Sequence, residues 1–411
     1  MGHTLVEKII GKKVGHEVNP GDIVTVDVDW CMIDDIMVPF AVQKFQEMGF
    51  SKVANPDSVV LIYDHFLPAT QVDDTRHFRV GDEFAEKYGI KHVHRTDGIC
   101  HQLMTEAGYV KPGDIAFGTD SHTVTYGCVG AFSTGIGYTE MAGILGTGQL
   151  WIRVPESIKV EIDGTLPGNV TSKDIILKII GLLTASGATY QSIEFTGSTV
   201  DAMSVASRMT MSNMSVEAGA KCGLFVPDEK TCDYCKIPYD ETIKELRPDD
   251  DAKYSKVIRL RAEDIVPVCA CPSLVDNIKP VSELKGTKID QVFLGSCTNG
   301  RLEDLRAAAL ILKGKHVHPY VKMIVTPASR KVYREALHDG TIEILSDAGC
   351  IITTPGCGLC CGRGGGILSD GETVVATNNR NFLGRMGTSK VNIYLASPIT
   401  AAKSAIAGEI V

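Results

Sequence analysis

Three cysteines lie close together in the stretch TTPGCGLCCGRGGG (353–366): Cys357, Cys360 and Cys361. The glycines beside them let the backbone approach a bound group closely. Thiols at this spacing are typical of zinc ligands, of a redox pair or of iron–sulfur ligands, and they also occur as inert side chains in a glycine-rich turn. This stretch alone does not distinguish these four kinds of site.

A further cysteine, Cys297, occupies a similar place in GSCTNG. Both segments follow an apolar run that predicts a buried strand, QVFL (291–294) and CIITTPG (350–356). Neighbouring parallel strands would bring Cys297, Cys357 and Cys360 to one edge of a sheet, where free backbone N–H groups stabilise anionic sulfur. Three thiolates suit an iron–sulfur cluster with one iron left open, because such clusters normally take four cysteines. The alternative is a tight turn with inert buried cysteines.

Two other cysteine pairs are weaker candidates. Cys232 and Cys235, in TCDYCK, have the C-x2-C spacing but fall in a region that we expect to be a loop. They are also far along the chain from the second such pair, whereas structural zinc motifs space their pairs tightly. Cys269 and Cys271 alternate with an alanine, which indicates buried structural thiols. The chain has thirteen cysteines, and since this number is odd and a cytosol keeps thiols reduced, we expect no disulfide framework.

Acidic and imidazole side chains gather at the ends of predicted elements in the first part of the chain. Asp64 and His65 end the strand-like run SVVLIYDHF, His101 lies in GICHQ, and Asp120 and His122 end GDIAFGTDSHT. Functional groups in open α/β sheets collect beyond the carboxyl ends of the strands. One adjacent Asp and His often form only a hydrogen-bonded surface turn, but three such groups favour an acid–base site.

Two arginines, Arg380 and Arg385, lie five positions apart in NNRNFLGR. Guanidinium groups in a turn rich in Asn and Gly suit bidentate binding of carboxylate or phosphate. The alternative is a pair of ordinary surface arginines.

Strands that alternate with helices position these groups. In the last third, QVFL and KMIVTP predict strands, the spacing of Leu302, Leu305, Ala309 and Leu312 predicts a helix, and VNIYLASPITAAKSAIAG predicts a strand followed by a helix. This alternation predicts parallel sheets and an α/β fold. We expect three α/β domains, which are residues 1–155, 156–272 and 273–411.

The composition limits the class of protein. The 411 residues are 44% hydrophobic and 22% charged, and the formal net charge of −9 without a long basic face argues against a nucleic-acid partner. We expect no membrane-spanning helix and no signal peptide, and therefore a cytoplasmic protein without a membrane partner. No nucleotide motif is complete, because GIGYTEMAGILGTG has Glu140 where a third Gly belongs; this stretch predicts tight helix packing instead.

Together the motifs resemble the aconitase and isopropylmalate-isomerase family of hydro-lyases. The matching segments occur in the family's order and cover nearly the whole chain: DHFLP, GICHQ, GTDSHT, MSNMSVEAGA, FLGSCTNGRLEDLR, GCGLCCG and NNRNFLGR. The combination of GSCTN with NRNF-x-GR is specific to that family.

The resemblance implies one [4Fe–4S] cluster per chain, held by Cys297, Cys357 and Cys360, with the substrate on the fourth iron. It also implies roles for the other site residues. Asp64, His65 and His101 would protonate the leaving hydroxyl, Asp120 would orient a histidine, and His122 and Glu217 would contact the iron-bound water or hydroxyl. Arg380 and Arg385 would hold substrate carboxylates, Asn213, Asn299 and Asn379 would lie close to the cluster, and Asp35 matches the family more weakly. Leu359 and Cys361 depart from the family's pattern, and the C-x2-C spacing favours Cys360 over Cys361 as the ligand.

Single-chain aconitases carry a fourth, swivelling domain with a serine base. This chain ends at Val411, after the expected third domain. The resemblance therefore implies three domains with parallel-type sheets around a central iron–sulfur cluster, no swivel domain, and a separate small swivel-domain subunit that supplies the base.

The implied reaction is the reversible dehydration of a 2-hydroxy dicarboxylate, best 3-isopropylmalate or a close alkylmalate such as 2,3-dimethylmalate. Gln102, in GICHQ, resembles the homoaconitase and aconitase members of the family more than its leucine-pathway members. An isomerase subunit of that type is therefore an alternative. A non-catalytic iron–sulfur sensor and a zinc-binding structural protein are further alternatives from other classes.

Overall fold

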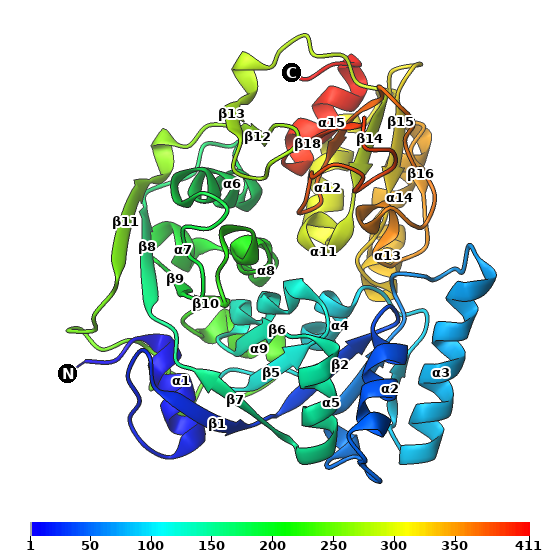
Figure 1. The fold of residues 1–411 in the computed structure, drawn as a ribbon. Helices are drawn as coiled ribbons and strands as arrows, with labels where there is room; N and C mark the ends of the chain where they lie inside the picture. The colour runs from blue at the N-terminus through cyan, green and yellow to red at the C-terminus, as the bar shows by residue number, and fades with distance from the viewer. Residues whose placement is uncertain (1) are drawn as a thin grey trace.

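Two parallel sheets and a third, mostly parallel sheet carry most of the strands in the computed structural model, which describes residues 2–411 (Figure 1). The first sheet has the strand order β4-β3-β2-β5-β6, with every neighbouring pair parallel. Its strands are β2 (Trp30–Asp34), β3 (Val59–Ile62), β4 (His92–His94), β5 (Ile115–Gly118) and β6 (Phe132–Gly135). The helices of this region are α1 (Leu5–Val14), α2 (Val38–Glu47), α3 (Val72–Tyr88), α4 (Cys100–Glu106) and α5 (Tyr138–Thr147), with the 3-10 helices η1 (Pro56–Ser58) and η2 (Ser121–Val129).

A two-stranded antiparallel ribbon leads from the first sheet to the second. It pairs β1 (Ile23–Asp27) with β7 (Gln149–Arg153). The second sheet is parallel, in the order β10-β9-β8-β11. Its strands are β8 (Ser157–Asp163), β9 (Ser192–Thr196), β10 (Cys222–Phe225) and β11 (Lys256–Arg261), and its helices are α6 (Ser172–Leu183), α7 (Ser198–Ala202), α8 (Val205–Met214), η3 (Ser215–Ala218), α9 (Glu229–Cys235), α10 (Glu241–Lys244) and η4 (Ala262–Asp264).

The third sheet has the order β13-β12-β18-β17-β14-β15-β16, parallel from β18 to β16. Its strands are β12 (Val268–Ala270), β13 (Ile278–Pro280), β14 (Gln291–Leu294), β15 (Lys322–Val325), β16 (Ile351–Ile352), β17 (Thr373–Ala376) and β18 (Asn392–Leu395). The helices are η5 (Val281–Glu283), α11 (Ser296–Asn299), α12 (Leu302–Leu312), α13 (Arg330–His338), α14 (Thr341–Asp347), η6 (Gly358–Cys361) and α15 (Pro398–Ala407). The predicted α/β fold with parallel sheets is confirmed.

Local sequence explains several of these elements. β3 is the apolar run VVLI, rich in β-branched residues and buried on both faces, as strands of parallel sheets are. Helix α15 begins with Pro398 at its first position, and the hydroxyl of Ser397 accepts a hydrogen bond from the backbone N–H of Thr400. In α12, the buried residues Leu305, Ala309 and Leu312 follow the helical spacing read from the sequence.

Two expectations are wrong, one about which strands are neighbours and one about a segment expected to be a loop. β14 and β16, which precede the predicted ligand cysteines, are not adjacent, because β15 pairs with both of them. β16 is also only two residues long and lies at the edge of the sheet. TCDYCK is not a loop: Cys232 and Cys235 are buried on helix α9, whose first turn is capped by the carboxylate of Asp228.

The expected division into domains at residues 155/156 and 272/273 stays a prediction. β7 and β8 lie on the two sides of the first position. The second position falls between β12 and β13, which pair with each other in the third sheet.

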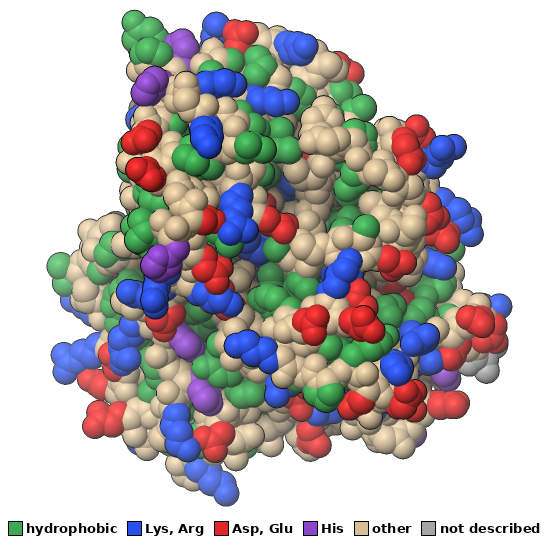
Figure 2. Space-filling model, turned by 180° about the vertical axis from the view of Figure 1, so that it is seen from behind, with side chains coloured by type: hydrophobic (Ala, Val, Ile, Leu, Met, Phe, Trp, Pro, Cys, Tyr) green, Lys and Arg blue, Asp and Glu red, His purple; other side chains and the backbone are tan. Residues whose placement is uncertain are grey.

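One continuous apolar core joins the three sheets. It includes Met32 of β2, Val160 of β8 and Phe293 of β14, all fully buried. A packed interior resists rearrangement, so side chains from different sheets are held at fixed positions relative to one another. No helix among residues 2–411 is long and apolar enough to cross a membrane. On the face seen in Figure 2, basic and acidic side chains are intermixed.

Candidate active site

The three cysteines predicted as ligands come together at the carboxyl edge of the third sheet. Cys297 is in α11, directly after β14, whereas Cys357 and Cys360 are at the start and in the body of η6, after β16. The side chain of Asn379 joins them: its Nδ2 donates to Sγ of Cys297 at 3.3 Å, and its Oδ1 lies 3.5 Å from Sγ of Cys360. Cys357 is the N-cap residue of η6, one turn before Cys360. All three cysteines are buried.

Tight turns allow this approach of the two cysteine segments. Ser296 has φ +71°, a left-handed conformation at the turn from β14 into α11. Gly358 has φ +60°, and a Cβ there would lie 2.9 Å from Oγ1 of Thr326, so glycine is required at this position. The loop after β17 is tied to the same turn, because Thr377 Oγ1 accepts from the backbone N–H of Gly295 at 3.0 Å.

Polar N–H groups point at the sulfur atoms. Asn213 Nδ2 donates to Sγ of Cys297 at 3.1 Å, and a terminal nitrogen of Arg385 lies 3.7 Å from Sγ of Cys360. Burial, followed by the neighbouring charge of Cys360, raises the pKa of the Cys297 thiol to about 12. Without a bound cation this thiol stays protonated, whereas the N–H groups around it favour a thiolate. The N–H groups around the sulfur atoms thus oppose the effect of burial on this thiol.

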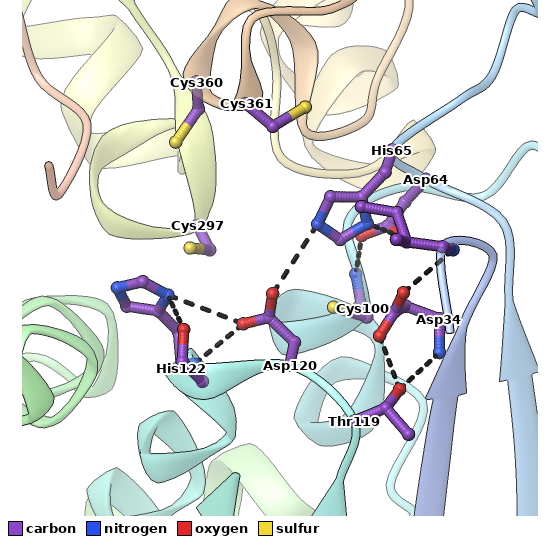
Figure 3. Close-up of polar contacts among 12 residues, drawn as sticks. Asp34, Asp64, His65, Cys100, Thr119, Asp120, His122, Cys297, Cys360 and Cys361 are labelled. Carbon is purple, nitrogen blue, oxygen red and sulfur yellow. Dashed lines mark hydrogen bonds and ion pairs between the residues drawn. The ribbon is translucent and has the colours of Figure 1, made fainter. Parts of the chain in front are cut away.

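The side chains of the adjacent residues Cys360 and Cys361 point in different directions. The sulfur of Cys361 lies on the side of His65, whereas that of Cys360 points away from His65 (Figure 3). The Sγ of Cys361 contacts the carbonyl oxygen of Gly358 at 3.6 Å, and the residue is only partly buried.

A cluster of carboxylates surrounds His65. Its Nδ1 lies 2.8 Å from Oδ1 of Asp64 and 3.4 Å from Oδ1 of Asp35, and its Nε2 lies 3.7 Å from Oδ2 of Asp120. Burial by itself would lower the pKa of His65, but the charge of Asp64 and the hydrogen bonds to Asp120, Asp35 and Asp64 raise it well above its ordinary value. The carboxylates around His65 therefore favour its protonated form.

Asp64 also links the first sheet to the third. One carboxylate oxygen accepts from the backbone N–H of Cys100 at 2.7 Å, and its carbonyl oxygen accepts from the backbone N–H of Cys357 at 2.9 Å. The acid–base cluster and the thiols are thus joined through the backbone.

Asp120 connects three histidines, of which His65 and His122 are labelled in Figure 3. It accepts from Nε2 of His101 at 2.7 Å and from the backbone N–H of His122 at 2.7 Å, and it faces His65. Burial would raise the pKa of this carboxyl, but the charge of His101 and the hydrogen bonds from all three histidines hold it well below its ordinary value. Asp120 is therefore ionised and orients His101, whose other ring nitrogen lies 3.5 Å from the hydroxyl of Tyr126.

His122, Glu217 and Arg380 form a second chain of contacts beside the thiols. Oε1 of Glu217 accepts from His122 Nε2 at 2.8 Å and from Arg380 Nε at 2.8 Å. Burial by itself would raise the pKa of Glu217. The hydrogen bond from His122 and the charges of His122 and Arg380 outweigh burial and lower this pKa below its ordinary value. Burial and the charge of Arg380 oppose protonation of His122, but its contacts with Asp120 and Glu217 raise its pKa.

Comparison with known proteins agrees with this geometry. A model of the aconitase family (aconitate hydratase) matches residues 7–285 and 273–408. The chain belongs to the aconitase family. The predicted resemblance, and with it the assignment to the hydro-lyases of that family, is confirmed.

Family relatives align over nearly their whole length. The chain is 48% identical to 3-isopropylmalate dehydratase large subunit 1 of Methanopyrus kandleri, over 100% of this chain and 98% of that protein. It is also 48% identical to the 3-isopropylmalate dehydratase large subunit of Sulfurihydrogenibium sp., over 100% of this chain and 96% of that protein. Among solved structures, aconitase X of Thermococcus kodakaraensis has the same overall fold, with a TM-score of 0.53 at 13% identity, over 92% of this chain and 89% of that one.

In this member of the aconitase family, nearly all residues predicted for the site lie in one connected set of contacts. The set contains Asp64, His65, His101, Asp120, His122, Asn213, Glu217, Cys297, Cys357, Cys360, Asn379, Arg380 and Arg385. Asn299 is different, because its Nδ2 donates to Asp304 at 2.9 Å and not to a thiol.

Sequence reasoning missed several supporting residues. Asp34 is buried beside His65 and accepts from the hydroxyl of Thr119. Arg301 is buried and donates to the carbonyl oxygens of Cys297 and Thr298. The position of Arg301 directly after the GSCTNG turn was a usable signal, whereas Asp34 has no pattern of its own.

Proposed function

We propose that this chain is the large, catalytic subunit of an iron–sulfur hydro-lyase that reversibly dehydrates a 2-hydroxy dicarboxylate. We further propose 3-isopropylmalate or a close alkylmalate, such as 2,3-dimethylmalate, as its substrate. The observation that carries the proposal is the position of Asn379, which contacts both Cys297 and Cys360 and is followed directly by Arg380 on the His122–Glu217 chain. Ligand thiols, a carboxylate-binding arginine and acid–base groups thus share one site. The names of the relatives support the substrate.

The residues fit a [4Fe–4S] cluster held by Cys297, Cys357 and Cys360. The three thiols are buried together, and amide and guanidinium N–H groups contact the sulfur of Cys297 and Cys360, which is the environment that anionic cluster sulfur requires. When bound, a cluster with one open iron supplies a Lewis acid for the departing hydroxyl group.

The imidazole groups manage the proton that the leaving hydroxyl requires. His101 is oriented by the ionised Asp120 and is the proposed donor, as general acids need both a fixed position and a charged partner. His65 faces the same carboxylate and helps to keep it ionised, so that Asp120 continues to orient His101. His122 and Glu217 lie on the thiol side, where they would contact the water that leaves or enters.

The arginines bind the dicarboxylate. Arg380 uses Nε for Glu217, which fixes the guanidinium and leaves its terminal N–H groups for a substrate carboxylate. Arg385 is held beside Cys360 and adds positive charge where a carboxylate accumulates charge as the α-proton leaves.

The base that removes this proton is proposed to come from a small subunit with a swivel-type domain. The relatives are named large subunits, and this chain covers 96–98% of the two described above. We also propose a cytoplasmic location, since all thirteen cysteines are free thiols.

Nothing specific favours the homoaconitase alternative. Gln102, which suggested it, is buried and directed at protein groups: its Oε1 accepts from Arg301 at 3.2 Å and its Nε2 donates to Glu106 at 3.0 Å. Its side chain supports the fold rather than a substrate.

An anaerobic assay with the small subunit tests the proposal. The two chains, produced together, are supplied with 3-isopropylmalate, 2,3-dimethylmalate, homocitrate and citrate, and the unsaturated product is measured. We expect turnover of an alkylmalate in preference to homocitrate and citrate, with iron and sulfide bound to the large chain. Zinc without iron, or a bound cluster without turnover of any of these acids, would contradict the proposal.

A further inference from the structure

A lysine without a carboxylate partner is buried near the two loops that carry the cysteines, GSCTNG (295–300) and GCGLCCG (356–362), which we call the cysteine loops. Lys173, in the first turn of α6, is completely buried. Its Nζ donates to the carbonyl oxygens of Thr377 and Asn378, each at 2.6 Å. None of the ion pairs found within residues 2–411 includes it. Burying an ammonium group without an anion is costly, so a buried lysine either loses its proton or keeps it because a negative charge lies nearby.

The two carbonyl groups belong to the segment that holds the sulfur atoms in place. Thr377 O also accepts from the hydroxyl of Thr298, one residue after Cys297, at 2.8 Å. Asn379, the next residue after Asn378, contacts the sulfur of Cys297 and of Cys360. Lys173 therefore reaches from helix α6 to a backbone segment that contacts both cysteine loops.

The electrostatic surroundings of Lys173 point to the same partner. Burial lowers the pKa of the ammonium group to about 7, and the charges that oppose this effect are those of Asp304, Cys360, Cys297 and Asp174. Neither carboxylate is in contact with Nζ. Three thiolates around an iron–sulfur core carry net negative charge, which would compensate the lysine directly.

We propose that Lys173 is a positioning residue for the cluster: its ammonium group fixes the Thr377–Asn378 backbone so that Asn379 reaches both sulfur atoms, and its positive charge stabilises the reduced cluster. This inference rests on the cluster of the proposed function. A purely structural lysine would affect the retention of the cluster, whereas a nearby charge also changes its reduction potential. Because reduction adds negative charge, removal of the ammonium group makes reduction less favourable.

The test compares Lys173→Met, Lys173→Arg and Lys178→Met with the unsubstituted large chain, all reconstituted anaerobically. Lys178 is a matched control, since it lies on the same helix and is partly exposed, with no hydrogen bond to the cysteine loops. The midpoint potential is followed by electron paramagnetic resonance, and loss of the visible absorbance band to a chelator gives the rate of cluster release. We expect Lys173→Met to have a lower potential and roughly tenfold faster release, as other changes around metal ligands do. Lys173→Arg and Lys178→Met should keep the original potential.

The outcomes separate this inference from the proposed function. A loaded Lys173→Met protein with the original potential would overturn the role of Lys173 and leave the cluster intact. If Lys173→Met does not fold or load, Lys173→Gln, which keeps an N–H donor without the charge, must show the lower potential. An unsubstituted chain that binds no cluster would overturn both proposals.

Discussion

Asp120 accepts a hydrogen bond from Nε2 of His101 at 2.7 Å, and this carboxylate is the group that all three histidines of the site share. A neutral amide at the same place would no longer stabilise an imidazolium or fix its orientation. We therefore expect Asp120→Asn to lower kcat of the assembled enzyme by roughly 10²–10⁴, the usual contribution of a general acid. Steady-state kinetics with the small subunit measures this effect, and the visible absorbance of the cluster should be retained.

A second Asp–His pair provides the control for that experiment. His94 Nδ1 lies 2.8 Å from Oδ2 of Asp97, in a more exposed place on the first sheet. Asp97→Asn removes the same kind of contact without touching the site and should leave kcat unchanged. Equal losses in the two variants would show that Asp120 acts only through the fold.

Cys360 and Cys361 are adjacent, and their different orientations lead to opposite expectations. Cys360 shares Asn379 with Cys297, whereas the Sγ of Cys361 contacts the carbonyl oxygen of Gly358. Cys360→Ser should abolish the visible absorbance of anaerobic protein, and Cys361→Ser should keep most of it. Retention by Cys360→Ser together with loss by Cys361→Ser would reverse the ligand assignment.

Arg380 is expected to act through its planar guanidinium. Lysine at this position keeps the charge but cannot hold Glu217 and a carboxylate at the same time. Hydrogen bonds between charged groups contribute about 1.5–3 kcal/mol, so Arg380→Lys should lower kcat/KM by roughly ten- to hundredfold. Arg259→Lys, in an exposed pair with Glu161, is the matched control. An unchanged kcat/KM would remove Arg380 from the substrate site.

Much of this site could be predicted because its residues follow recognisable local patterns. Cys297 and Asp120 each come directly after an apolar strand, and the carboxyl ends of parallel strands lie on one side of a sheet. The pairing of strands could not be predicted in the same way, since it depends on packing between distant segments; β15 therefore separates β14 from β16 without any local signal. Lys173 was missed for a related reason, because an amphipathic helix shows which face is buried but not what that face meets.

Asp34 should make stability depend on pH. Burial is the main cause that raises the pKa of its carboxyl from the ordinary 3.8 to about 6. The folded protein thus holds this proton more tightly than the unfolded chain, and the cost of ionising Asp34 develops as pH rises from 3.8 to about 6. Above that range the cost is complete, at about 3 kcal/mol for a shift of this size. Asp34→Asn, which keeps an acceptor for the backbone N–H groups of Ile36 and Met37, should be stabilising.

Thermal unfolding at pH 5 and pH 8 measures this difference. The gain from Asp34→Asn should be larger at pH 8, and Asp57→Asn, at an exposed carboxylate paired with Lys91, should give no such difference. A gain that is equal at the two pH values, or a loss at pH 8, would show that the hydrogen bonds of Asp34 outweigh its desolvation.

The backbone hydrogen bond between Asp64 and Cys357 joins residues that are almost 300 positions apart in the chain. During synthesis the first sheet emerges early, whereas η6, β17 and the loop with Arg385 emerge late, before only β18 and α15. The buried thiols and the N–H groups that contact them therefore come together only on a nearly finished chain. A chain truncated before β17 would keep Cys297, Cys357 and Cys360 but lack Asn379 and Arg385, the side chains that contact the sulfur atoms of Cys297 and Cys360. If the proposed cluster is correct, its iron and sulfide are therefore held firmly only by a nearly finished polypeptide.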